Sequence, residues 1–217
     1  MSGKDDAPDD PTYDALPLVE DQRRGNLAWV LPAVTAVASV LLVRLYHTPL
    51  AAGIGGAALF VATLATVVTH YHLRDERATA RSLAGIGLAF LTHASAFFLL
   101  TMIYSNKWRS MYSATAIALA TMLMLLQMTD GEEIAWLRRL LYALIGGLLI
   151  GQATWALNYW AATGWTGGAM LLVFFYLIAG LTTQQNRGNL TRRVLVEYLV
   201  VTGLAFAIIT ASVTLAR

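Results

Sequence analysis

The chain has 217 residues, of which 57% are hydrophobic and 13% charged, with a net charge of +2. Soluble domains carry about 25% charged residues, so this composition excludes a typical soluble globular protein. Cysteine is absent, which excludes disulfides, thiolate catalysis and iron–sulfur clusters.

The first 26 residues are acidic and differ from the rest of the chain. They carry seven acidic side chains against three basic ones and three prolines, Pro8, Pro11 and Pro17. Such a segment cannot bury enough apolar surface to order itself. It also has no basic stretch followed by an apolar one, as a cleaved signal peptide would. We predict a disordered acidic cytoplasmic tail over 1–26, a membrane domain over 27–217, and a first span that acts as an uncleaved insertion signal.

Seven apolar segments separated by short polar breaks fill the rest of the chain. A hydrocarbon core about 30 Å thick needs roughly 20 helical residues, and unpaired backbone groups are costly there. The sequence therefore predicts an all-α bundle of seven transmembrane helices. The predicted spans are Leu27–Tyr46, Pro49–His70, Ser82–Tyr104, Met111–Thr129, Leu137–Leu157, Gly167–Gln184 and Val194–Ala216.

The breaks between these spans predict the orientation. Basic residues are more frequent in cytoplasmic loops than in outer ones. One side has ten: Arg23, Arg24, Arg74, Arg77, Arg81, Arg138, Arg139, Arg187, Arg192 and Arg193. The other side has four: Arg44, Lys107, Arg109 and Arg217. We therefore expect a multi-pass protein of the cell membrane with its N-terminus cytoplasmic and its C-terminus outside.

Small residues occur at helical spacing in several spans. Gly147 and Gly151 form a GxxxG motif, which lets two helix backbones approach closely. We interpret them as a packing groove within the bundle, with homo-oligomer formation or a membrane-protein partner as the alternative. The same groove interpretation covers the glycines of earlier spans, Gly53, Gly55, Gly56, Gly85 and Gly87.

His93 lies at the middle of the third predicted span, where an ionisable residue indicates a functional site. Phe90 and Phe97 share its helical face, and Ala89 and Ala96 leave room beside it for a flat ligand. The structural interpretation is a hydrogen bond to another helix. The functional alternatives are a haem or chlorophyll ligand and a proton relay. A second histidine is missing at this depth, which argues against bis-histidine haem.

Three further polar residues complete the set of ligand-binding or relay candidates. Glu197 lies about one turn into the last span, four residues after Arg193, so the two side chains share a face and can pair. Gln152 lies in the outer half of the fifth span and Asn158 directly follows that span, where they would line an outward-facing cleft or cross-link helices.

The chain lacks residues that several known activities of membrane proteins require. His70 and His72, with Asp75 and Glu76, resemble one histidine box of the membrane desaturases, which need several. The segment 130–133 resembles motifs of the CAAX-type intramembrane proteases and the CDP-alcohol phosphotransferases, but no later histidine or aspartate completes either. Microbial rhodopsins need a lysine in the last span, and here the lysines are Lys4 and Lys107. We predict no catalytic residues and no metal site.

These inferences favour a non-enzymatic membrane module: a scaffold, a sensor or an accessory subunit of a membrane complex, with a lipid or pigment held near the third span. The alternative is a small transporter or channel for a neutral or weakly charged solute, which would use His93, Glu197, Gln152 and Asn158. The lipid bilayer is the expected partner in both cases, and no nucleic-acid partner is expected.

Overall fold

The computed structural model describes residues 27–73, 78–106, 110–129, 134–160 and 163–215. These residues form helices and no strand, and the predicted all-α bundle of seven helices is confirmed. The acidic segment 1–26 lies outside the described residues. The helices are α2 (Val30–Tyr46), α3 (Pro49–Leu73), α4 (Ala78–Ser105), α5 (Ser110–Met128), α6 (Trp136–Asn158), α7 (Gly164–Asn186) and α8 (Arg192–Leu215).

Six of the seven helices are long and apolar enough to cross a membrane, and α2 is the exception. α2 has 17 residues, which corresponds to about 26 Å at 1.5 Å per residue. It begins at Val30 rather than at the predicted Leu27, because Leu27–Trp29 form a turn whose Leu27 carbonyl accepts the N–H of Val30 at 3.0 Å. Pro32 fits in this first turn, where a missing N–H breaks no helical hydrogen bond.

The connection between α2 and α3 is a two-residue turn with local hydrogen bonds. His47 adopts the left-handed conformation, with φ of 49°, and its N–H binds the carbonyl of Val43. Thr48 then accepts the N–H of Ala51 at 3.1 Å, and Pro49 begins α3 with a φ already suited to a helix. The two helices are thereby joined as an antiparallel hairpin.

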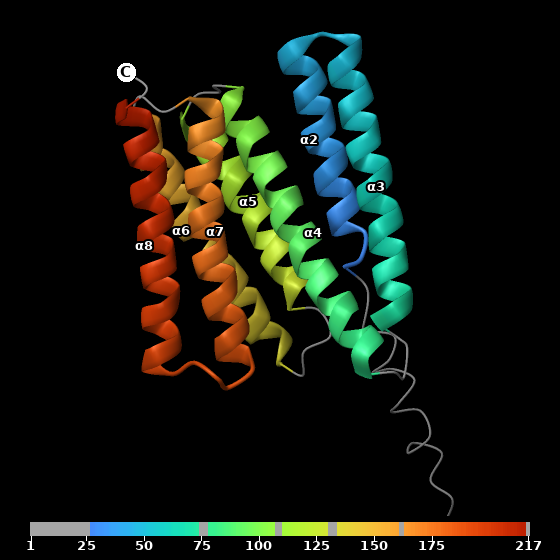
Figure 1. The fold of residues 1–217 in the computed structure, drawn as a ribbon, viewed down its shortest axis with the longest axis vertical. Coiled ribbons are helices and arrows are strands. Elements are labelled where there is room, and N and C mark those ends of the chain that lie inside the picture. The colour runs from blue at the N-terminus through green and yellow to red at the C-terminus, as the bar shows by residue number, and fades with distance from the viewer. Residues whose placement is uncertain (1–26, 74–77, 107–109, 130–133, 161–162, 216–217) are drawn as a thin grey trace, which may run out of the picture.

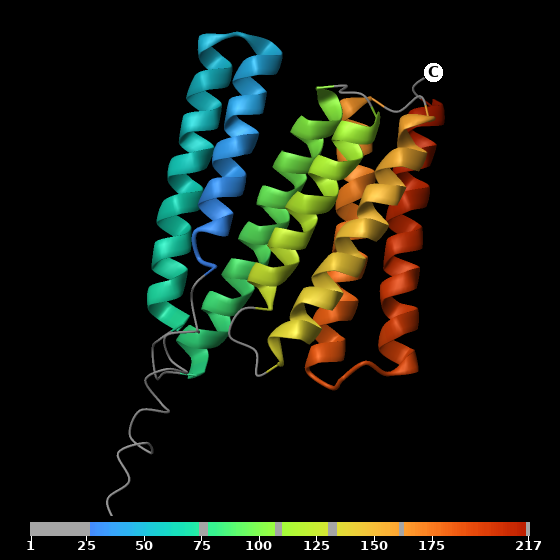
Figure 2. The ribbon, with the colours of Figure 1, turned by 180° about the vertical axis from the view of Figure 1, so that it is seen from behind.

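The helices lie side by side with their axes roughly parallel or antiparallel (Figure 1). The α2–α3 hairpin occupies one flank, α8 occupies the other, and α4–α7 lie between them, as the reverse view also shows (Figure 2). α4 packs against α2, α3, α5 and α7, whereas α8 packs against no other described helix than α7. α4 and α7 therefore connect the two flanks.

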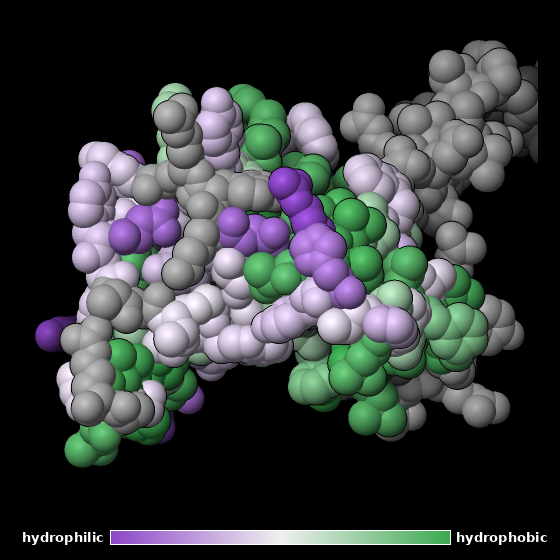
Figure 3. Space-filling model, turned by 90° about the horizontal axis from the view of Figure 1, so that it is seen from above, coloured by the Kyte–Doolittle hydropathy of each residue, from purple (hydrophilic) through white to green (hydrophobic). Residues whose placement is uncertain are grey.

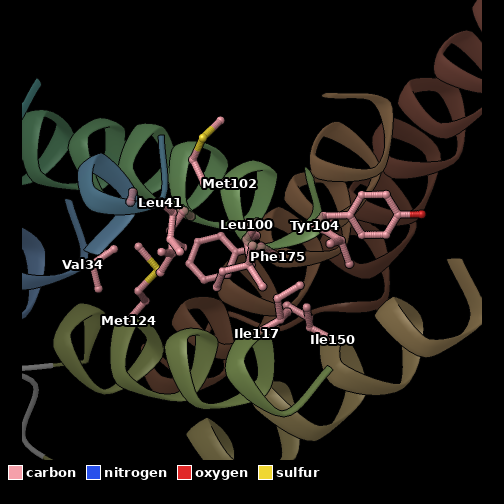
Figure 4. Close-up of a cluster of buried hydrophobic side chains, with 14 of the residues drawn as sticks. Val34, Leu41, Leu100, Met102, Tyr104, Ile117, Met124, Ile150 and Phe175 are labelled. Atoms are coloured by element: carbon pink, nitrogen blue, oxygen red, sulfur yellow. The ribbon is translucent and has the colours of Figure 1, made fainter. Parts of the chain in front are cut away.

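The buried apolar core extends from α2 across α4 and α5 to α6 and α7. Phe175 of α7 is fully buried and lies among side chains from the neighbouring helices, including Leu100, Ile117, Met124 and Ile150 (Figure 4). Each of these residues is fully buried, and each comes from an apolar span that the sequence predicts. Close packing of such large side chains fixes the four central helices relative to one another.

Apolar side chains also cover the outer flanks of the bundle, as expected where lipid replaces water. α8 has one buried residue, Thr202, and exposes Leu204 and Ile208 among many others. Seen from the end where α2 joins α3 (Figure 3), strongly hydrophilic residues are few. The described basic residues of the predicted cytoplasmic side lie toward the opposite end, which we call the basic end. They are Arg81, near the start of α4, and Arg138, Arg139, Arg187, Arg192 and Arg193.

Candidate functional site

His93 lies half-buried on α4 and is bonded within its own helix. Its Nδ1 is 2.7 Å from the carbonyl oxygen of Ala89, one turn earlier. Because a carbonyl can only accept, Nδ1 is the donor. Nε2 is buried and has no hydrogen-bond partner among the described residues. The described helices therefore do not provide the expected hydrogen bond to another helix, and His93 makes aromatic contacts instead.

These contacts form an aromatic row across three helices. The ring of His93 meets Phe175 edge to face at a centroid distance of 5.3 Å, and Tyr176 at 6.0 Å. Tyr176 in turn meets Tyr198 of α8 at 5.4 Å. The Tyr198 ring lies against Gly180, where a Cβ atom would overlap it. The row thus connects the middle of α4 to the peripheral helix α8 through α7.

The surroundings of His93 leave less room for a flat ligand than the sequence predicts. Phe90, expected on the same side, is 74% exposed on the flank of the bundle. Phe97 instead packs toward Trp165, with ring centroids 6.1 Å apart. The space beside His93 is filled by Phe175 from α7. A helical pattern shows which residues of α4 share a face, but it does not show which side chain of another helix fills the space.

Of the other three candidate residues, one lies near the surroundings of His93 and two do not. Glu197 is exposed on α8 and forms no ion pair with Arg193 in the structure, although both residues are described. It interacts electrostatically with the phenol of Tyr176, the ring beside His93. Asn158 donates to the hydroxyl of Ser113 at 3.4 Å and so connects α6 to α5. Gln152 is exposed on α6 and has no hydrogen-bond partner in the described chain. The four residues therefore do not line one common site.

Gly147 and Gly151 are buried against α5 within the same chain. A Cβ on Gly147 would lie 2.6 Å from the carbonyl oxygen of Ala118, and one on Gly151 would lie 3.0 Å from the Ala118 Cβ. Gly164 and Gly168 form a second GxxxG that the sequence interpretation missed, at the start of α7. A Cβ on either glycine would overlap α4 at Ser105 or Thr101.

Most glycines of the earlier spans are not packed against another helix. Gly53, Gly56, Gly85 and Gly87 have open space where a Cβ would lie, so in this structure they form no groove against another helix of the chain. The expectation is wrong for these four. Gly55 is the exception, because its carbonyl accepts a hydrogen bond of 2.8 Å from Ser39 of α2.

Hydroxyl side chains connect α2 to its neighbours, and the sequence interpretation did not identify them. Thr35 of α2 and Ser95 of α4 are buried, with their hydroxyl oxygens 3.2 Å apart. Ser39 also bonds the carbonyl of Thr35 at 2.8 Å. Small polar residues commonly hydrogen-bond between membrane helices. Their spacing of four along α2 is a signal that was present in the sequence.

An apolar groove of about 270 Å³ lies between α2, α4 and α5. α2 contributes Val37 and Leu41, α4 contributes Leu99 and Ile103, and α5 contributes Ala120 among other apolar residues. Val37 is 53% exposed, so the groove is open to the surface on the flank of the bundle. The groove uses another part of α4 than His93, which does not line it.

The described residues contain no group of three or more histidine, cysteine, aspartate or glutamate side chains that could hold a metal ion. The acidic residues of the two enzyme-like motifs, at positions 75–76 and 130–133, lie outside the described part of the chain. Of the remaining motif residues, His70 and His72 belong to the last turns of α3.

The fold and these apolar surfaces define a multi-pass helical membrane protein. Its sequence matches over residues 15–212 the family described as "Protein of unknown function (DUF5656)". The chain belongs to this family, since the match covers nearly all of the chain. No curated protein and no solved structure matches the chain significantly.

Proposed function

We propose that the protein is a non-enzymatic module of the cell membrane that holds one hydrocarbon chain of a lipid in the groove between α2, α4 and α5. The groove carries this proposal, because it is a concave site on the third span of the sequence and all its lining side chains are apolar. Ligand sites in proteins are typically concave and mostly apolar.

The chemistry of the lining favours a hydrocarbon over a polar solute. A polar solute in a water-free groove would need hydrogen-bond partners, and residues such as Val34, Leu41 and Ile103 supply none. The volume of about 270 Å³ is at the lower end of the range for small-molecule sites, about 300–1,000 Å³. It suits a single chain better than a large pigment. Trp29 lies at the end of the groove nearest the start of α2.

The arrangement of polar residues supports a binding role over the two alternatives. A catalytic site needs a nucleophile, a base and a stabilising group close together. A solute path needs polar groups along one route. Glu197 interacts with Tyr176 beside His93, but Gln152 is exposed on α6 and Asn158 bonds Ser113 of α5. The four residues therefore form neither a catalytic set nor a continuous polar route, and neither an enzyme nor a transporter draws support from them.

Lipid photolabelling would test the proposal. A phospholipid with a diazirine at mid-chain should label peptides of α2, α4 and α5 more strongly than peptides of α8, although α8 is the most exposed helix. Ala120→Phe places a ring in the groove and should lower this labelling several-fold. The matched control is Ala207→Phe, because Ala207 is exposed on α8 and this change should leave labelling of the groove as it is. Equal labelling of all lipid-facing helices, unaffected by Ala120→Phe, would contradict the proposal.

A further inference from the structure

Gln152 is a polar side chain on an otherwise apolar outer face. It is exposed on α6 and has no partner in the described chain. The residues on either side along this face are large and exposed: Leu148, Leu149, Trp155 and Tyr159. Because Gln152, Trp155 and Tyr159 follow the spacing i, i+3 and i+7, they form one continuous stripe.

The depth of Gln152 makes an unpartnered amide unfavourable. It precedes Asn158, the last residue of α6, by six positions, which places it about 9 Å along the axis from that helix end. Trp155 lies between it and this end, and Tyr159 directly follows the end, where aromatic residues mark the membrane interface. A primary amide in hydrocarbon without a hydrogen bond costs several kcal/mol. This cost favours any arrangement that supplies a donor and an acceptor.

We propose that this face of α6 is the interface with a second copy of the chain, centred on Gln152. An amide is self-complementary: across a two-fold axis, Nε2 of each copy donates to Oε1 of the other, so that both groups are satisfied at once. A lipid acyl chain offers neither a donor nor an acceptor. Polar side chains at such positions associate membrane helices through hydrogen bonds.

The alternative interface through Gly147 and Gly151 is already used within the chain. Both glycines face Ala118 of α5, with Met122 beside Gly147 and Ala114 beside Gly151, and a second copy cannot reach them without displacing that helix. The Gln152 stripe lies on another side of α6 and is covered by no described residue. The Trp155 and Tyr159 rings, 5.9 Å apart, give it a rigid apolar edge beside the amide.

Disulfide cross-linking tests this interface, since the chain has no cysteine of its own. Ala156→Cys places a thiol one turn from Gln152 on the same exposed side and keeps the amide. With a mild oxidant in native membranes, Ala156→Cys should form a covalent dimer in most of the protein. Leu204→Cys, at an exposed site on α8, is the matched control and should give only the background of random collisions.

Removal of the amide distinguishes a specific pair from simple proximity. Adding Gln152→Leu to Ala156→Cys should lower the cross-linked fraction at least several-fold, while adding Gln185→Leu, at an exposed glutamine of α7, should leave it unchanged. The inference is overturned if Ala156→Cys cross-links no better than Leu204→Cys, or if Gln152→Leu has no effect. Lipid labelling of the groove is independent of either result.

Discussion

The phenol of Tyr104 on α4 donates a hydrogen bond of 2.9 Å to the backbone carbonyl of Leu157, in the last turn of α6. The bond is buried, and the ring lies against Gly167 of α7, where a Cβ atom would overlap it. Three helices therefore meet at one side chain. A hydrogen bond in such a setting stabilises packing because water does not compete for the carbonyl.

Tyr104→Phe should weaken this junction and leave the ring packing in place. We expect the free energy of unfolding to fall by about 0.5–1.5 kcal/mol, the usual contribution of one hydrogen bond. Unfolding by SDS in mixed micelles would measure the change. The control is Tyr112→Phe, because Tyr112 is 65% exposed and its hydroxyl has no partner in the described chain. A similar loss for both variants would contradict a specific role for the Tyr104 hydroxyl.

Gly147→Ala should destabilise the α5–α6 pair. The added methyl would lie 2.6 Å from the backbone carbonyl oxygen of Ala118, which cannot move aside as a flexible side chain can. Overpacking of this kind costs about 1–3 kcal/mol. Gly53→Ala, into open space on α3, should instead stabilise its helix by up to about 1 kcal/mol, the difference in helix propensity. The same unfolding assay would show opposite signs for the two variants, and equal signs would refute the assignment.

Helix positions followed from the sequence, because hydropathy and span length depend on local composition alone. The predicted span Pro49–His70 corresponds to α3, and Leu137–Leu157 corresponds to α6. The late start of α2 could not be predicted from the sequence. Leu27–Trp29 are apolar enough to belong to the span, but they form a turn before the helix.

The candidate site could be predicted less well from the sequence than the helix positions. The contacts of each candidate side chain depend on which helices face one another. Gly147 and Gly85 look alike in the sequence, yet the first contacts α5 and the second faces open space. The sequence identified His93 as an ionisable residue at the middle of a span, but its neighbour Phe175 lies 82 positions later. A helical period assigns residues to a face and leaves the opposing helix undetermined.

His93 should behave as a packing residue. His93→Phe keeps a flat ring against Phe175 and removes the buried Nε2, which has no partner, so we expect unchanged or slightly higher stability. His93→Ala leaves a cavity between α4 and α7 and should cost about 1–3 kcal/mol. Thermal unfolding in mild detergent would compare them. An absorption band that belongs to a bound pigment and disappears in His93→Phe would contradict this interpretation.

Gln127 is the most completely buried amide of the described chain, at 3% exposure, and neither its Nε2 nor its Oε1 has a partner. Unsatisfied polar groups in a core are costly, and an apolar residue of similar shape removes the cost. Gln127→Leu should therefore raise the free energy of unfolding by about 1 kcal/mol. Gln185→Leu at an exposed site should change it little. A loss of stability in Gln127→Leu would show that the amide is hydrogen-bonded in the membrane.

The predicted orientation can be tested with single cysteines in this cysteine-free chain. Thr163 directly precedes α7 and is exposed at the end of the bundle opposite the basic end, whereas Asn189 is exposed in the connection from α7 to α8 at the basic end. Basic residues are retained on the cytoplasmic side during insertion. With a membrane-impermeant maleimide on intact cells, Thr163→Cys should be labelled, and Asn189→Cys should be labelled only after permeabilisation.

Labelling at these two sites distinguishes the two possible orientations of the protein in the membrane, whatever its function. Arg187 lies beside Asn189, and Arg192 and Arg193 begin α8 three residues later, so moving this connection outside would carry three charges across the bilayer. At the other end, Arg44 is the described basic residue nearest the end of α2. Labelling of Asn189→Cys but not Thr163→Cys in intact cells would reverse the assignment. Replacing Arg187, Arg192 and Arg193 by glutamine should weaken the bias, so that a fraction of Asn189→Cys becomes accessible from outside.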